Sequence, residues 1–177
     1  MKKDFVLPIV VLTLICVVVT GALAMMNNAT APIIEAAASE RAFTAMSNKI
    51  PQATSFVPIE TEGFPRTIRA AYRTENDVGY IFIISVSGFS GEIRIMCAVS
   101  NDGRIISSST LQHTETQGIG TILDKDSFTS QFDGKDINLE GVSAVSGATI
   151  STVAYIEAIR NALEAMELIR GGYDGKN

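Results

Sequence analysis

The chain has 177 residues, which is enough for one globular domain and a smaller additional segment. Its formal net charge is −5 and it has no basic cluster, which argues against nucleic acid as a partner. Cys16, Cys97 and the single histidine, His113, form neither a metal-ligand spacing nor a disulfide framework. The composition therefore argues against a nucleic-acid-binding protein and against a histidine-based metal centre.

The segment Phe5–Met26 carries no charged residue and is long enough to cross a bilayer as a single helix. Lys2 and Lys3 precede it, so the positive-inside rule places the N-terminus in the cytoplasm and the globular part outside. Residues 22–24 (Ala-Leu-Ala) have the form of a signal-peptide cleavage site, which is the competing interpretation. Because the apolar run exceeds the usual signal-peptide core, the sequence favours an uncleaved transmembrane anchor.

A helical stalk and a linker are expected after the anchor. Pro32 suits the first turn of an alanine-rich helix that continues to about Asn48. The prolines between Ile50 and Pro65 then predict a loop that holds at most one short strand. The expected divisions are residues 1–27 for the membrane anchor, 28–65 for the stalk and linker, 66–171 for an α+β domain and 172–177 for a frayed tail.

An antiparallel meander of four strands is predicted next, because apolar residues alternate between turn signals. The expected strands are Thr67–Arg73, Gly79–Ser87, Glu92–Ser100 and Arg104–Leu111. Two apolar rows are expected on one sheet face: Tyr80, Phe82, Ile84 and Val86, and then Ile93, Ile95, Cys97 and Val99. A sheet with such a face must be covered on that side.

Three further elements are predicted after the meander. They are a short helix at Lys125–Phe132 with Asp124 as a candidate cap, a strand within Ile137–Val145 and a long helix at Thr149–Arg170. The apolar side of the long helix is expected to hold Val153, Ile156, Ile159 or Ala162, Leu163, Met166 and Ile169. This helix is the natural cover for the sheet, which gives an α+β fold.

The residues Ser146-Gly147-Ala148-Thr149 lead into the long helix. A hydroxyl at the first turn lies beside unpaired N–H groups and the positive end of the helix dipole, where a phosphate is well stabilised. The plainer interpretation makes Ser146 an ordinary N-cap and Gly147 a turn residue. Spacing alone leaves both interpretations open.

His113 and Glu115 are the closest acid–base pair in the sequence. Two residues apart on an extended segment, they would share a face and form either a catalytic dyad or a solvated loop pair. Thr149 has no general base next to it in sequence, so a self-activated nucleophile is not supported.

Three motifs follow the apolar N-terminal segment in a fixed order. They are G-F-S-G at 88–91, H-T-E-T-Q-G-I-G at 113–120 and S-G-A-T at 146–149. In this order the chain resembles the FMN-binding domain family, and within it the G subunit of Rnf electron-transport complexes, which is similar to the C subunit of the sodium-pumping NADH:quinone oxidoreductase. The resemblance covers most of the chain.

The resemblance implies that FMN is joined to Thr149 through a phosphoester bond, installed by a separate flavin transferase. It implies that Ser146, Gly147 and Ala148 flank that bond, and that the pocket is shaped by Glu115, Thr116, Gly118 and Gly120. The chain departs from the family pattern at four positions. Ser143 replaces an acidic residue of the flavinylation pattern, Gln117 a proline, Ile119 a leucine and Ser90 a common glycine.

The resemblance also implies a function. The chain is expected to be a flavoprotein subunit in the cell membrane that relays electrons, with no independent catalysis and with other membrane subunits of an Rnf-type complex as its partners. That complex would couple electron transfer between ferredoxin and NAD to sodium or proton movement. The alternatives are an exported non-redox binding module, a free-standing extracellular flavin carrier and a hydrolytic His113–Glu115 pair.

Overall fold

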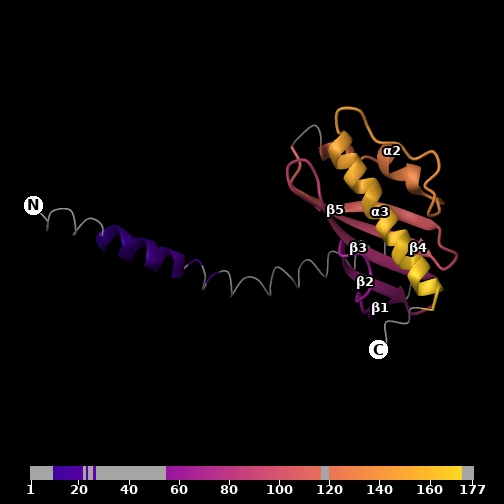
Figure 1. Ribbon diagram of the computed structural model, residues 1–177, viewed down its shortest axis with the longest axis horizontal. Coiled ribbons are helices and arrows are strands. Elements are labelled where there is room, and N and C mark those ends of the chain that lie inside the picture. Colours follow the sequence, from indigo (N-terminus) through magenta and orange to yellow (C-terminus); the bar gives the residue numbers. More distant parts are fainter. Residues whose placement is uncertain (1–9, 22, 24–25, 27–54, 117–119, 173–177) are drawn as a thin grey trace, which may run out of the picture. The chain divides into compact units, whose positions relative to one another are not determined.

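The computed structural model describes residues 10–21, 23, 26, 55–116 and 120–172 (Figure 1). The chain divides into two compact units, Met1–Thr44 and Ala45–Asn177. Residues 10–21 of the first unit are helical, and none of the helices among the described residues is both long and apolar enough to cross a membrane. The predicted span Phe5–Met26 lies partly outside the described residues, and the predicted helix Pro32–Asn48 lies wholly outside them.

The second unit contains a five-stranded antiparallel meander in which the strands lie in chain order (Figure 1). The strands are β1 (Phe56–Ile59), β2 (Ile68–Thr74), β3 (Gly79–Ser87), β4 (Glu92–Ser100) and β5 (Ile105–His113). The four predicted strands correspond to β2–β5, and the bounds of β3 and β4 are those predicted. With helices on the sheet, the α+β class is confirmed.

β1 is a short edge strand that lies in the stretch for which a loop with at most one strand was expected. Pro58 sits within it, opposite Tyr72 of β2. Proline has no N–H to donate, and an edge strand needs donors on only one side. The short length and the proline also discourage pairing with another chain.

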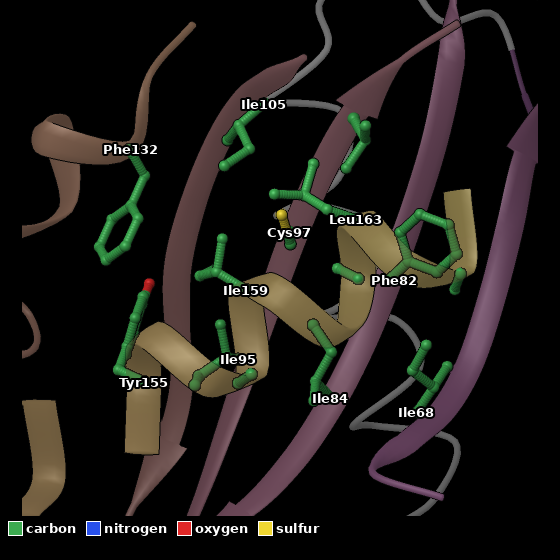
Figure 2. Packing of buried hydrophobic residues seen from close by; sticks show 14 of the residues in the cluster. Ile68, Phe82, Ile84, Ile95, Cys97, Ile105, Phe132, Tyr155, Ile159 and Leu163 are labelled. Atoms are coloured by element: carbon green, nitrogen blue, oxygen red, sulfur yellow. The ribbon is translucent and has the colours of Figure 1, made fainter. Parts of the chain in front are cut away.

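One face of the sheet is covered by α3 (Thr149–Arg170), which packs on β3 and β4. Figure 2 shows Ile159 and Leu163 of α3 lying over the side chains of Phe82, Ile95 and Cys97. These side chains are at most 1% exposed and belong to one continuous apolar cluster. The two predicted apolar rows of β3 and β4 belong to this core or pack against it.

The predicted apolar side of α3 is wrong at Val153, whose side chain is 44% exposed. The helix instead buries Ser151 and Tyr155, and further along its axis Ala158 and Ala165. Alanines have little side chain, so they allow the helix to lie close to the sheet. A periodic pattern of large apolar residues does not reveal such a face.

Three short elements lie between β5 and α3, and the last two of them cover nearly all of the predicted helix Lys125–Phe132. They are η1 (Gly120–Ile122), α2 (Asp126–Thr129) and η2 (Ser130–Phe132). The predicted cap Asp124 is wrong, because the N-cap is Lys125 and makes no side-chain cap bond. Phe128 and Phe132 pack against Tyr155, with ring centroids 5.2 and 5.4 Å from the tyrosine ring.

The strand predicted within Ile137–Val145 is also wrong, because this stretch holds turns at residues 137–138 and 140–141 and is otherwise irregular. The Asn138 N–H donates to the Asp136 side chain at 3.0 Å, and the Val142 N–H donates to the Leu139 carbonyl at 3.1 Å. Leu139 and Gly141 both have positive φ. Local side-chain-to-backbone bonds and left-handed residues favour turns over a ladder of strand hydrogen bonds.

Candidate functional site

Antiparallel pairing brings two of the sequence motifs together. β4 pairs with both β3 and β5, so the turn at residues 88–91 lies beside the end of β5. His113, the last residue of β5, is opposite Ile93. The Thr114 N–H donates to the Glu92 carbonyl at 3.3 Å and extends the contact past the strand. The meander itself therefore places the 88–91 turn next to residues 113–116.

Glu115 joins these two motifs to the start of α3. Its side chain is buried, and Oε1 accepts a hydrogen bond from the Ser90 N–H at 3.0 Å. Oε2 accepts from the Ser151 hydroxyl at 2.7 Å. Burial alone would raise the pKa of this carboxyl, but the hydrogen bonds from Ser151 and from backbone amides outweigh it, so the net pKa is lowered. The carboxylate is therefore ionised at neutral pH.

Two glycines leave room for the Glu115 side chain. A Cβ at Gly88 would lie 2.2 Å from Glu115 Oε1, and one at Gly120 would lie 2.4 Å from Glu115 Cβ. Both distances are too short for any side chain to be tolerated without movement of Glu115. Gly120 was predicted as a pocket residue and the structure places it against Glu115, while Gly118 lies outside the described residues.

Thr116 adds a second link between the motifs. Its Oγ1 lies 3.0 Å from Ser90 Oγ, within hydrogen-bond distance. Ser90 is one of the positions at which this chain differs from the family pattern, and its hydroxyl has a partner here. No role for Ser90 was predicted, since nothing in the sequence pairs residues 90 and 116.

His113 and Glu115 do not form the side-chain dyad considered from the sequence. His113 Nε2 lies 3.1 Å from Asp124 Oδ2, and His113 Nδ1 accepts a hydrogen bond from the Glu115 backbone N–H at 3.2 Å. The Glu115 carboxylate is engaged instead by Ser90 and Ser151. The arrangement gives no support to a hydrolytic pair.

The S-G-A-T motif forms the entry to α3. The N-cap of the helix is Ala148, which has no side-chain cap bond, so the interpretation of Ser146 as an ordinary N-cap is wrong. Gly147 has φ +85°, a conformation that favours glycine, and the space where its Cβ would lie is open. Thr149 is exposed, and its Oγ1 is 3.5 Å from the Val145 carbonyl, at the outer limit of a hydrogen bond. The hydroxyl is thus accessible at an uncapped helix N-terminus.

A pocket of about 280 Å³ lies at this helix start. Its lining residues are Phe89, Gly147, Ala148, Thr149, Ile150 and Ser151. Phe89 and Ile150 are 62% and 56% exposed, so they give the pocket an apolar rim. Two other hollows, of about 450 and 640 Å³, contain none of the predicted site residues.

Three of the pocket residues, Phe89, Ile150 and Ser151, were not predicted from the sequence. The one available signal was Phe89, because a large aromatic residue in a glycine-flanked turn is poorly placed for burial. Of the predicted residues, Gly147, Ala148 and Thr149 line the pocket, whereas Glu115, Thr116 and Gly120 are not among its lining residues. Ser146 precedes the pocket on the same segment.

Comparison with known proteins identifies relatives of the chain. The FMN-binding domain family matches residues 88–164. Over 113 residues the chain is 31% identical to the G subunit of the proton-translocating ferredoxin:NAD(+) oxidoreductase complex of Clostridium ljungdahlii, covering 58% of this chain and 61% of that protein. Over 185 residues it is 27% identical to the G subunit of the ion-translocating oxidoreductase complex of Methanosarcina acetivorans, covering 96% and 98%.

A third relative, the G subunit of the ion-translocating oxidoreductase complex of Shewanella baltica, is 32% identical over 94 residues, which cover 45% of this chain and 44% of that protein. The chain thus spans less than two thirds of the first and third of these relatives and nearly all of the second. The matched range 88–164 includes the 88–91 turn, Glu115 and the S-G-A-T motif. These matches confirm the resemblance: residues 88–164 match the FMN-binding domain family, and the chain is similar to the G subunits of ion-translocating oxidoreductase complexes.

Proposed function

We propose that this chain is a membrane-anchored flavoprotein subunit that carries FMN on Thr149 through a phosphoester bond and relays electrons in an Rnf-type complex. One observation carries the proposal: the exposed Thr149 hydroxyl borders a pocket at the uncapped N-terminus of α3, inside the range that matches the FMN-binding domain family. The family match supports FMN as the ligand. The local geometry supports Thr149 as its attachment point.

The residues around Thr149 fit the two parts of FMN. The free N–H groups and the dipole of a long helix stabilise a phosphodiester anion beside the Thr149 oxygen. The open space at Gly147 admits the phosphate close to the backbone. The apolar side chains of Phe89 and Ile150 suit the faces and the dimethylbenzene end of the flat ring system. When bound, FMN supplies the redox chemistry, and the protein binds and orients it.

Attachment of FMN requires a separate flavin transferase in this proposal. None of the residues that line the pocket is an acid or a base. Both oxygens of Glu115 are engaged, and His113 contacts Asp124 instead of Thr149. A threonine hydroxyl without a neighbouring base is a weak nucleophile. The described residues therefore support a passive acceptor of the flavin.

The proposed setting is the cell membrane. Phe5–Met26 would form a single-pass anchor with the N-terminus in the cytoplasm, and residues 28–65 a stalk and linker. The FMN-binding domain at residues 66–171, followed by a short tail at 172–177, would then lie on the outer side. The partners would be the other membrane subunits of a complex that couples ferredoxin and NAD electron transfer to the movement of sodium or protons. The names of two relatives support this, since one is a subunit of a proton-translocating ferredoxin:NAD(+) oxidoreductase complex and the other of an ion-translocating oxidoreductase complex.

The test uses the full chain co-expressed with a flavin transferase in an exporting host. Each variant is denatured, separated on a gel and examined for flavin fluorescence. We expect a fluorescent band for wild type and for Thr129→Val, a control in α2 that lies outside the pocket lining. We expect a dark band for Thr149→Val, because this change removes only the hydroxyl oxygen that would bear the phosphate.

Two results would contradict the proposal. A fluorescent Thr149→Val band would place the attachment on another residue. A dark wild-type band, with the transferase active on a known substrate, would exclude covalent FMN and return the exported binding module as the better interpretation.

A further inference from the structure

The Glu115 carboxylate lies behind the pocket. Glu115 is not among the pocket's lining residues, and both of its oxygens are used by protein donors. Those donors, however, belong to the two walls of the pocket. Ser90 directly follows Phe89 in the 88–91 turn, and Ser151 is itself a lining residue in the first turn of α3. The carboxylate therefore connects the two segments between which the pocket opens.

We propose that Glu115 is a positioning residue: its carboxylate ties the 88–91 turn to the first turn of α3 and so holds Phe89 at the rim of the flavin pocket. This inference rests on the proposed function for the identity of the ligand. The hydrogen bonds of the Glu115 carboxylate join only residues of this chain, so they can be tested without the ligand.

Burial of the ring does not hold Phe89 in place, because its side chain is 62% exposed. The turn must therefore be held in place by the hydrogen bonds of its backbone. The Ser90 N–H donates to Glu115 Oε1 at 3.0 Å, and the backbone amides of Phe89 and Gly91 also lower the pKa of this carboxyl. A hydrogen bond to an ionised acceptor is about twice as strong as a neutral one.

Glutamine replaces the carboxylate only in part. Its amide oxygen can still accept from the Ser90 N–H and its NH₂ group can donate to the Ser151 hydroxyl, but the acceptor is no longer charged, so the hydrogen bond from the turn is weaker. The absence of any room for a Cβ at Gly88 shows how closely the turn approaches Oε1. Glu115→Gln should therefore release the turn locally while leaving the sheet and α3 intact.

The first experiment needs no flavin. Chymotrypsin cuts after exposed phenylalanines in mobile segments, so the rate of cleavage between Phe89 and Ser90 in the native full chain reports how firmly the turn is held. We expect faster cleavage at this bond in Glu115→Gln than in wild type. Glu157→Gln, an exposed position on α3, is the matched control and should cleave at the wild-type rate. Cleavage after the buried Phe82 should stay slow in all three, which reports an intact core.

The second experiment uses the flavin-loaded full chain and a double-mutant cycle. Iodide quenching of native flavin fluorescence should rise in Phe89→Ala and in Glu115→Gln. If Glu115 acts through Phe89, the double variant should be quenched no more than Phe89→Ala alone. Covalent attachment is scored separately on a denaturing gel, and quenching is compared per attached flavin, so that a change in loading is not read as a change in exposure.

The outcomes separate this inference from the proposed function. Wild-type cleavage kinetics in Glu115→Gln, or additive quenching in the double variant, would overturn the positioning role even with flavin bound. A dark wild-type band on the denaturing gel would contradict covalent FMN, and the cleavage experiment would still decide the role of Glu115. If Glu115→Gln does not fold, Ser151→Ala, which keeps the charge and removes one donor, is measured in its place.

Discussion

At the residue scale, the Glu115 carboxylate should make part of the stability of the domain depend on pH. Its pKa is lowered in the folded state, since hydrogen bonds from Ser151 and the 89–91 amides outweigh the desolvation by burial. A group with a depressed folded pKa stabilises the fold above its unfolded pKa, about 4.3 for glutamate. That contribution is lost as the pH falls through the folded pKa.

The measurement is urea unfolding of wild type, Glu115→Gln and the exposed control Glu157→Gln at about pH 7 and about pH 3, which is well below the unfolded pKa. Glu115→Gln should be less stable than wild type at the higher pH. The difference between their free energies of unfolding should become smaller at the lower pH. Glu157→Gln should follow wild type at both. A gap of equal size at the two pH values would show that the charge of Glu115 contributes nothing.

Gly147 and Gly134 offer a matched pair of substitutions. Their φ angles are +85° and +73°, and a Cβ at either position would meet no atom within 4 Å. Replacement of either glycine by alanine should lower the free energy of unfolding by about 1–2 kcal/mol, because alanine is strained in the left-handed conformation. Only Gly147 lines the pocket, so only Gly147→Ala should also weaken flavin fluorescence on the denaturing gel. Equal flavin loading in both variants would mean that open space at Gly147 is not used by the ligand.

At the element scale, the register of α3 can be tested by two alanine substitutions. Ile159 is fully buried against the sheet, whereas Val153 is 44% exposed. Ile159→Ala should lower the free energy of unfolding by about 2–5 kcal/mol, because it removes buried apolar area and leaves a cavity. Val153→Ala should stay within about 0.5 kcal/mol of wild type, as exposed positions usually do. The measurement is the free energy of unfolding in urea, and comparable losses at both positions would contradict the observed face of the helix.

The elements that could be predicted from the sequence are those whose pattern is local. β3 and β4 are apolar runs bounded by turn residues, and α3 is long and periodic, so their bounds follow from the sequence. The exposed Val153 and the alanine-lined face depend on how closely α3 approaches the sheet, which periodicity does not encode. In the turns within residues 137–141, the Asp136 side chain accepts a backbone N–H that a strand would use in its ladder. Residue propensities do not predict which of the two hydrogen bonds forms.

The site was predictable in part for a related reason. The motif order points to Thr149, Gly147 and Ala148, which line one pocket. The orientation of Glu115 was not predictable, because it is set by Ser90 and by Ser151, a residue 36 positions later in the chain. Long-range contacts of this kind arise from the meander bringing the end of β5 beside the β3–β4 turn.

At the scale of the whole molecule, the proposed topology predicts which face of the membrane carries the domain. Glu157 is exposed on α3, so Glu157→Cys should react with a membrane-impermeant maleimide in intact cells. The unsubstituted chain is its own control. Cys97 is fully buried, burial raises the pKa of its thiol, and the thiolate is the reactive form. Cys16 lies within the proposed span, where lipid would shield it.

Labelling of Glu157→Cys only after the cells are broken would place the domain in the cytoplasm and contradict the positive-inside argument from Lys2 and Lys3. The mass of the purified chain decides between the two N-terminal interpretations. An uncleaved anchor keeps Phe5–Met26 and resists extraction from membranes by alkaline carbonate, whereas a cleaved signal peptide leaves a chain that begins after Ala24 and is released. Retention matters for the proposed function, because a carrier held at the membrane stays within reach of the subunits with which it exchanges electrons.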